Sequence, residues 1–318
     1  MDFRRIILII AAAAAVITSC KKDEEDEAKP FIKGTMEIEG LPEFITPAFK
    51  CSLTAKGAEH PEGKDISYSW KVSPGMDKYD TTDVFNYVFP DSLCTYTVYC
   101  NAFATGYTSN STFAYTTAAK AGKDGSITGI DYQSEILDGK YYYGTVGEDT
   151  WTFNNLAEGD GIGFRKSEVM AEVFGRFYNH ADAVAACESL SGDWVLPTKE
   201  DWEKLETYVK SNPSFGKSTA AALMGDASFN GNLMWEYWPA VGDITNSTGF
   251  SAIPVGYANT KTCNFTGTYE YAVFWTSTSV EDDDTMAYYK YFIFNEPDMF
   301  TGKADKESFG ASVRCIRK

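Results

Sequence analysis

Histidine is scarce in this chain: among 318 residues only His60 and His180 occur, and they fall in separate predicted domains. A Ser/His/Asp triad needs its histidine beside the nucleophile, so no such triad is expected. The seven cysteines include no Cys-x-x-Cys pair, and a zinc site built from His and Cys is not expected either. The sequence therefore predicts no catalytic residue, no cofactor and no enzyme. A secreted hydrolase stays open as a third alternative, because so acidic a chain can hold paired carboxylates.

Basic residues are also few, since 28 Lys and Arg stand against 45 Asp and Glu, a formal net charge of −17. Such a charge repels the phosphate backbones of DNA and RNA. Nucleic acid is therefore not an expected partner. Aromatic residues make up 15% of the chain and, with frequent Thr and Val, favour β-strands.

The apolar run near the N-terminus is too short to cross a bilayer, because a spanning helix needs about 20 apolar residues and residues 6–16 supply eleven. Arg4 and Arg5 precede the run, and Ile-Thr-Ser-Cys follows at 17–20. This order is typical of a bacterial lipoprotein signal. We expect cleavage of residues 1–19 and lipidation of Cys20, so that only a lipid anchor touches the membrane. An ordinary secretory signal that happens to carry a cysteine is the alternative.

Residues 20–30 start with Cys20 and carry a dense charge run at 21–27 without an apolar side chain. Such a run has nothing to bury and is expected to be a solvated tether. It resembles the acidic export signal that follows the lipidated cysteine in surface lipoproteins of the Bacteroidetes. The resemblance implies an outer-membrane protein exposed at the cell surface, with the periplasmic face as the alternative. Removing residues 1–19 takes away one acid and two arginines and leaves 44 acidic against 26 basic residues, a net charge of −18.

Residues 31–118 carry short alternating runs broken by Gly, Pro and Asp, which is typical of an all-β sandwich. The expected strands include residues 49–53, 66–72 and 93–103, each with apolar side chains in phase on one face. These runs resemble strands of an immunoglobulin-like fold, and part of the segment also resembles PKD-type modules of bacterial surface proteins. A spacer that lifts the following domain from the membrane is the expected role.

The immunoglobulin-like resemblance also implies a disulfide in this domain. Cys51, Trp70 and Cys100 match the inter-sheet bridge that packs against a core tryptophan. We therefore predict a bridge between Cys51 and Cys100. Cys94 is a competing partner on the same strand face, and buried free thiols are the other alternative.

Residues 119–129 are rich in Ala, Lys, Gly, Asp and Ser and are predicted to be a linker. The second domain, residues 130–318, is expected to be α+β, with two helices among short strands and long loops. One helix is expected over 180–190, where apolar residues recur on one face. The other is expected over 198–210, because Thr198 is followed three residues later by an acid, as at a helix N-cap.

Five sequence blocks of this second domain occur in the order found in one known family. By these blocks residues 130–318 resemble the Fibrobacter succinogenes major paralogous domain. The resemblance implies a C-type lectin-like fold with two helices and a looped antiparallel sheet. The blocks are YGTVG, TWT and NNL within 143–156, GDWVLPT at 192–198, GFSAIPVG at 249–256, FWTST at 274–278 and GASVRCI at 310–316.

In such folds a cysteine of the first helix is bridged to one of the last strand. The resemblance therefore implies a disulfide between Cys187 and Cys315. Closing so long a loop stabilises a protein by about 4 to 5 kcal/mol in the chain-entropy model. Cys263 then has no mate and is expected to be a buried thiol.

Calcium-dependent sugar binding by C-type lectins uses Glu-Pro-Asn or Gln-Pro-Asp, followed by a Trp-Asn-Asp strand. Here Glu-Pro-Asp at 296–298 comes after Trp275, and Thr and Ser follow that tryptophan. Both the order and the ligands differ, so no metal site of that kind is expected. One further acidic run could supply carboxylate oxygens to calcium, with a solvated turn as the alternative: Glu281, Asp282, Asp283 and Asp284.

Aromatic residues in the loops of this domain are the predicted ligand-binding residues, because rings stack on sugars and on partner side chains. We predict an adhesin or ligand-recognition protein that binds a glycan or a protein on host, diet or neighbouring cells. The alternatives are packing of each ring in a minor core and, for the whole protein, an accessory subunit of a surface assembly. The candidates are Trp235, Tyr237, Trp238, Tyr257, Tyr269 and Tyr271.

Overall fold

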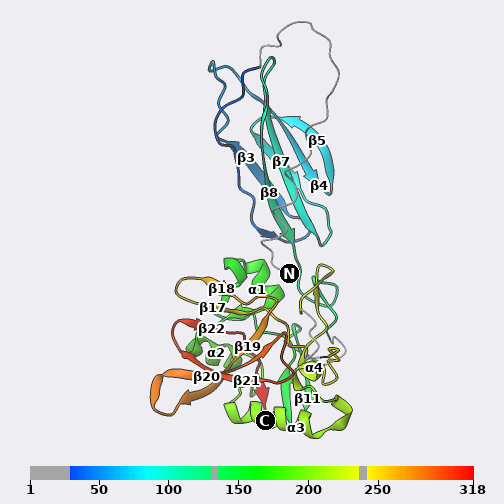
Figure 1. The fold of residues 1–318 in the computed structure, drawn as a ribbon, viewed down its shortest axis with the longest axis vertical. Helices are drawn as coiled ribbons and strands as arrows, with labels where there is room; N and C mark the ends of the chain where they lie inside the picture. The colour runs from blue at the N-terminus through cyan, green and yellow to red at the C-terminus, as the bar shows by residue number, and fades with distance from the viewer. Residues whose placement is uncertain (1–28, 131–134, 236–241) are drawn as a thin grey trace, which may run out of the picture.

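The computed structural model describes residues 29–130, 135–235 and 242–318. In the N-terminal part, eight strands of these residues form two sheets, ordered β1-β3-β6 and β2-β8-β7-β4-β5. Figure 1 shows this part as an elongated body next to the C-terminal part. The strands are β1 (Glu37–Glu39), β2 (Phe44–Ile45), β3 (Lys50–Lys56), β4 (Ser67–Ser73), β5 (Met76–Thr81), β6 (Val84–Val88), β7 (Thr95–Phe103) and β8 (Asn110–Ala118).

The two sheets close over one apolar core, to which alternate residues of the long strands contribute. On β7, Tyr96, Val98 and Cys100 are buried, while the residues between them are more exposed, as expected for a strand with one face inward. Trp70 of β4 stacks on Phe85 of β6 with ring centroids 5.2 Å apart, which joins the sheets. The three strands predicted for this domain are present as β3, β4 and β7.

The predicted bridge between Cys51 and Cys100 is wrong, because both residues are free thiols. Cys51 lies near the start of β3, opposite Tyr87, and its sulfur is 3.9 Å from the Tyr87 carbonyl oxygen. Ring contacts of 5.1 Å lead from Tyr87 to Phe89 and from Phe89 to Tyr96. Cys100 is opposite Trp70 of β4 in the other sheet, so the two thiols have different neighbours.

The C-terminal part is α+β and holds all four α-helices of the described residues, none of which is long and apolar enough to cross a membrane. The helices are α1 (Glu168–Phe174), α2 (His180–Glu188), α3 (Lys199–Ser211) and α4 (Thr219–Leu223). The strands are β9 (Ile127–Thr128), β10 (Glu135–Leu137), β11 (Tyr141–Val146), β12 (Asp149–Thr152), β13 (Ile162–Gly163), β14 (Arg176–Phe177), β15 (Ser228–Phe229), β16 (Asn232–Leu233), β17 (Tyr257–Asn259), β18 (Asn264–Thr266), β19 (Tyr271–Val280), β20 (Asp283–Ile293), β21 (Phe300–Asp305), β22 (Phe309–Gly310) and β23 (Ile316–Arg317).

An antiparallel sheet of β19, β20 and β21 separates two apolar clusters of this part. Phe274 faces the cluster that contains Trp202 of α3, whereas Val273 and Trp275 face the cluster that contains Cys187 of α2. Neighbouring residues of a strand point to opposite faces, so one strand serves both clusters. The face of the sheet on which an aromatic side chain lies therefore determines which helix packs over it.

The two helices predicted for this domain are confirmed as α2 and α3. Thr198 caps α3 through a capping box with Asp201, which satisfies backbone N–H groups at the helix start. The bridge between Cys187 of α2 and Cys315 is present and joins residues 128 positions apart. The short helices α1 and α4 are additions to the prediction.

The segment predicted to be a linker, residues 119–129, packs against the C-terminal part. Ile127 is buried within β9, and β9 pairs with β15. Phe44 of β2 contacts Phe164 with ring centroids 6.1 Å apart. The two parts therefore contact each other through packed side chains, in addition to the covalent connection of the chain.

Candidate functional site

The structure separates the aromatic residues that the sequence predicts to bind a ligand. Trp235 is only 3% exposed, and its indole N–H donates to the Ala252 carbonyl oxygen at 3.2 Å. A ring this buried, with its N–H satisfied, offers nothing to a ligand, so the prediction for Trp235 is wrong. Tyr237 and Trp238 lie outside the described residues.

Tyr269 lies apart from the other two predicted tyrosines. It is half-buried and packs against the apolar cluster that contains Phe164 and Phe177. This burial raises the pKa of the Tyr269 hydroxyl. Tyr257 and Tyr271 pack against a different cluster, so Tyr269 is not part of their group.

Tyr257 and Tyr271 do lie together, with ring centroids 6.2 Å apart. Four further rings continue from them across β20, β21 and β22, and all six side chains are half-buried. We call this set the tyrosine face. Its members are Tyr257, Tyr271, Tyr289, Tyr291, Phe300 and Phe309.

The rings of the tyrosine face form an unbroken series of contacts. Tyr257 stacks on Phe309 at 5.4 Å and 28°, and Phe309 stacks on Tyr289 at 4.9 Å and 27°. Tyr289 lies 5.7 Å from Tyr291, and Tyr291 stacks on Phe300 at 5.4 Å and 27°. Offset-stacked pairs at these spacings are the favoured arrangement of aromatic rings. The series therefore fixes the orientation of each ring through its neighbours.

Strand alternation places four of these rings on one face of the β19–β20–β21 sheet. Tyr289 and Tyr291 alternate on β20 with buried residues. Tyr291 is directly opposite Phe300, and Tyr289 is opposite Gly302. A Cβ atom at Gly302 would lie 2.2 Å from the Cζ atom of Tyr289. Glycine at this position therefore leaves the space in which the Tyr289 ring lies over β21.

The four hydroxyls of the tyrosine face, on Tyr257, Tyr271, Tyr289 and Tyr291, make no hydrogen bond to any described residue, although each ring packs in the series. Burial, followed by the neighbouring tyrosines, raises the pKa of Tyr289. Burial, followed by Glu270 and the neighbouring tyrosines, raises the pKa of Tyr271. Both hydroxyls therefore stay protonated at neutral pH, and each can donate and accept a hydrogen bond. The face combines apolar rings with unused polar tips.

One exposed ion pair stands near the Phe309 end of this face. The Lys261 ammonium group lies 2.8 Å from a carboxylate oxygen of Glu307, and Glu307 is two residues before Phe309. Because both side chains are exposed, the pair contributes little to stability. It gives the edge of the aromatic face a polar border.

The acidic run considered for calcium forms the tight turn between β19 and β20. Glu281 and Asp282 are the two turn residues, and Asp283 and Asp284 begin β20. All four side chains are exposed, and an Asp283 carboxylate oxygen accepts from the Thr285 backbone N–H at 3.0 Å. No group of three or more potential metal ligands occurs in the described ranges. The run is a solvated turn.

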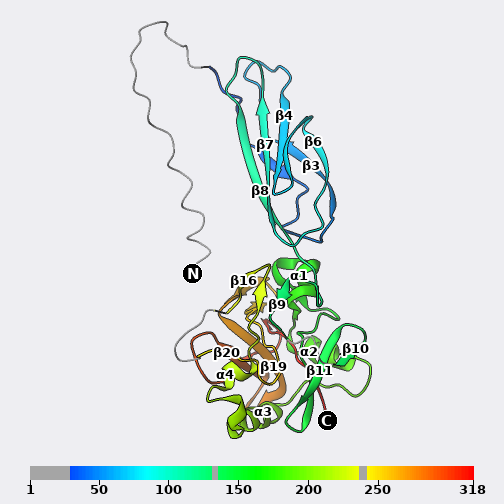
Figure 2. The ribbon, with the colours of Figure 1, turned by 90° about the vertical axis from the view of Figure 1, so that its right-hand side faces the viewer.

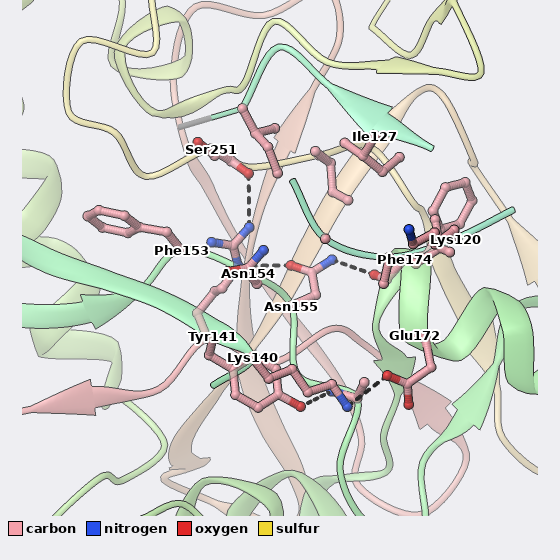
Figure 3. A pocket seen from close by; sticks show the side chains of 17 residues that line it. Lys120, Ile127, Lys140, Tyr141, Phe153, Asn154, Asn155, Glu172, Phe174 and Ser251 are labelled. Atoms are coloured by element: carbon pink, nitrogen blue, oxygen red, sulfur yellow. Dashed lines mark hydrogen bonds and ion pairs between the residues drawn. The ribbon is translucent and has the colours of Figure 1, made fainter. Parts of the chain in front are cut away.

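A small cavity of about 50 Å³ lies where the segment after β12 meets α1 (Figure 3). Figure 3 shows Lys140 directed toward Glu172, at 2.8 Å, and the Asn155 amide directed toward the Phe174 carbonyl oxygen, at 2.9 Å. These polar groups at the cavity thus form ion pairs and hydrogen bonds with one another. They hold α1 against the strands.

Arg314 lines the same cavity and is 1% exposed. Its guanidinium donates to the Asn155 side chain at 2.8 Å and to the carbonyl oxygens of Thr152, Phe250 and Ser251 at 3.2, 2.8 and 3.0 Å. All four acceptors are neutral, and burial lowers the pKa of Arg314 to about 9. This arginine ties the closing segment of the chain to two distant segments, residues 152–155 and residues 250–251, which is a structural role.

These observations describe a disulfide-bridged α+β domain with an aromatic surface on one side of its central sheet. Residues 131–317 match the family model of the Fibrobacter succinogenes major domain. The match covers more than half of the chain, and the protein belongs to this family. A search of the curated proteins finds no relative that matches the chain.

Four members of the tyrosine face are missed by the sequence prediction: Tyr289, Tyr291, Phe300 and Phe309. The signal for Tyr289 and Tyr291 is present, because two tyrosines two positions apart share one face of a strand. Both faces of β20 carry large apolar side chains, however. Alternation cannot show which of two apolar faces is left partly open.

Proposed function

We propose that this protein is a lipid-anchored recognition protein of the cell surface, an adhesin whose tyrosine face binds a carbohydrate chain. One observation supports the proposal above the others. Four tyrosine hydroxyls without a partner among the described residues are gathered on a single packed series of rings. The family match spans the residues of this face but carries no activity with it.

The chemistry of the face suits a sugar. Ring surfaces take the apolar C–H faces of pyranoses, and tyrosine keeps a polar tip for hydrogen bonds. Unpaired hydroxyls are hydrated in the free protein, and a sugar hydroxyl can take the place of that water at little cost. Because the rings already fix one another by stacking, little side-chain entropy is lost on binding.

The test is a glycan array probed with the chain from Lys21 onward, with and without calcium. We expect a specific signal that does not depend on calcium. Tyr289→Ala and Tyr291→Ala should abolish the signal for at least one glycan, whereas Tyr208→Ala should leave every signal unchanged. Tyr208 is a 39% exposed tyrosine on α3, outside the tyrosine face, and so is a matched control.

Two results would contradict the proposal. Survival of every glycan signal in both substitutions on the tyrosine face would show that the sugars bind elsewhere. An array without signal, combined with a stoichiometric protein partner pulled down from membranes, would favour the role of an accessory subunit in a surface assembly.

The anchor is tested separately. Cys20→Ser should prevent incorporation of labelled fatty acid and release the protein from the membrane fraction. Surface exposure predicts that protease added to whole cells degrades the protein. Protection in intact cells, with degradation after the outer membrane is opened, would place it on the periplasmic face.

A further inference from the structure

A second group of aromatic rings lies on the N-terminal part. Tyr99, Phe113 and Tyr115 are 42%, 56% and 59% exposed. Tyr99 is paired opposite Phe113 across β7 and β8, with ring centroids 6.1 Å apart, and Phe113 lies 5.4 Å from Tyr115. Figure 2 shows β7 and β8 in the layer away from β3 and β6. The rings are therefore on the solvent side of the five-stranded sheet, which we call the outer face.

The side chains around these rings are small and polar. Strand register and alternation place mainly hydroxyl and amide groups beside them. Two of these hydroxyls, on Thr95 and Thr117, are hydrogen-bonded to each other at 3.0 Å. Lys71 is the one charged side chain that β4, β7 and β8 place on the outer face. The polar set is Ser67, Ser73, Thr95, Thr97, Asn101, Ser111 and Thr117.

The strands at and next to the rings, β4, β7 and β8, place little charge on the outer face, which limits what the rings can bind. Without residues 1–19 the protein carries 44 acids and 26 bases, a net charge of −18, yet β4, β7 and β8 place no carboxylate on this face. Ionic partners are recognised through charges of opposite sign. A surface of rings, hydroxyls and one amide instead complements an uncharged molecule that offers both C–H faces and hydroxyls.

A second copy of the chain fits this surface poorly. Three aromatic side chains bury about 150–250 Å² each when fully covered, so their exposed portions offer on the order of 300 Å². A stable protein interface uses about 800 Å² from each partner. Two copies would also bring together two bodies of charge −18. A narrow ligand suits the outer face better.

We infer that the outer face of the N-terminal part is a second binding site, whose ligand is a neutral polysaccharide. Tyr99, Phe113 and Tyr115 contact the C–H faces of sugar units, and the surrounding hydroxyls and Asn101 hydrogen-bond to the sugar hydroxyls. This site uses no residue of the tyrosine face and stands independently of the function proposed for it. The N-terminal part is then a binding module and not merely a spacer.

The test is affinity electrophoresis of the chain from Lys21 onward in gels that contain xylan, glucomannan or starch. At least one of these neutral polysaccharides should retard the protein. Replacing all three rings by threonine (Tyr99→Thr, Phe113→Thr and Tyr115→Thr) keeps strand propensity and should lower the retardation at least tenfold. Circular dichroism and the melting temperature show that the variant is folded.

Two control variants make the result specific. Val88→Thr changes a 52% exposed apolar residue on β6 of the other sheet and should leave the retardation unchanged. Tyr289→Ala with Tyr291→Ala removes two rings of the tyrosine face and separates the two sites, because the polysaccharide whose retardation the triple variant loses should still retard this double variant. Loss in this double variant, with retention in the triple variant, would assign the polysaccharide to the tyrosine face alone and overturn the inference.

Three further outcomes overturn it. The wild type runs freely through all three polysaccharides, or the triple variant is retarded as strongly as the wild type. Alternatively, sedimentation shows a dimer of the wild type that the triple variant loses, which would make the outer face an interface between copies of this chain.

Discussion

Tyr289 of β20 stacks on Phe309 of β22, with ring centroids 4.9 Å apart and planes 27° apart. The two strands belong to different sheets, β19-β20-β21 and β18-β17-β22. This contact therefore joins rings from both sheets into one surface. Each stacked pair contributes about 0.5–1.5 kcal/mol beyond the burial of its area, which keeps the surface formed in the absence of a ligand.

Removing only the hydroxyls of Tyr289 and Tyr291 should weaken sugar binding and leave the fold intact. Neither hydroxyl has a partner among the described residues, so the Phe variants lose no internal contact and stability should change by less than about 0.5 kcal/mol. Two lost hydrogen bonds of about 1 kcal/mol each should weaken binding at least tenfold. Titration calorimetry with the glycan that the array identifies measures this. Tyr208→Phe is the control, and an unchanged affinity of the double Phe variant would refute a role for the hydroxyls.

Gly302→Ala should displace the Tyr289 ring. The added Cβ would lie 2.2 Å from the Cζ atom of that ring, and forcing a ring to move typically costs about 1–3 kcal/mol. We expect a lower free energy of unfolding in urea and weaker glycan binding. Thr301→Ala, at the adjacent exposed position, should change neither. Normal binding by Gly302→Ala would mean that the position of Tyr289 does not matter.

The thiol content tests the disulfide pattern. After denaturation without reductant, the chain from Lys21 onward should titrate four thiols, because four cysteines after Cys20 are free. A count of two would reveal a second bridge, and a count of six would mean that Cys187 and Cys315 are not joined. The expected free cysteines are Cys51, Cys94, Cys100 and Cys263.

Loss of the bridge should be costly. Cys187 and Cys315 are 128 positions apart, and the loop-entropy model gives about 4 to 5 kcal/mol for closing a loop of that length. Cys187→Ala with Cys315→Ala should lower the urea midpoint accordingly. Cys263→Ser, which changes a half-buried free thiol, is the control, and equal losses in the two variants would contradict the prediction.

His180 should make stability depend on pH just below neutrality. Its Nε2 atom is 3.0 Å from the Thr276 carbonyl oxygen, and burial lowers the pKa of its ring below the ordinary value of about 6.5. The unfolded chain therefore binds a proton at His180 more readily than the folded chain does. This contribution to stability is complete above about pH 6.5 and is lost as pH falls through the folded pKa.

Urea unfolding between pH 7 and pH 5 measures the effect. The wild type should lose stability over this range, and His180→Gln should reduce the slope. A slope unaffected by the His180 substitution would assign the pH dependence to other groups.

Local patterns in the sequence predict the elements that depend on them. The capping box of Thr198 and Asp201 begins α3 where the spacing of Thr and acid predicts a helix start, since an N-cap satisfies backbone groups of its own turn. The strands β4 and β7 likewise follow from period-2 alternation. Cys187–Cys315 follows from the family resemblance, and the structure contains it.

Contacts between distant segments are not predicted in this way. Cys51 and Cys100 have the residue types of an inter-sheet bridge, but Cys51 pairs opposite Tyr87 of β6, Cys100 pairs opposite Trp70 of β4, and both thiols are free. Trp235 lies in a segment whose composition is typical of a loop. The tertiary structure nevertheless buries its side chain, and the indole N–H donates to the Ala252 carbonyl oxygen. Both errors concern the relative position of strands or loops, on which residue type carries no information.

The sequence by itself determined the acidic charge, the N-terminal signal pattern, the β-rich N-terminal part, the two main helices and the family of the C-terminal part. These properties depend on composition or on residues close together in the chain. Only the tertiary structure decided which aromatic rings remain reachable. Burial depends on what each strand face meets, and Tyr257 joins Tyr289 only because β17, β20 and β22 bring their rings together in space.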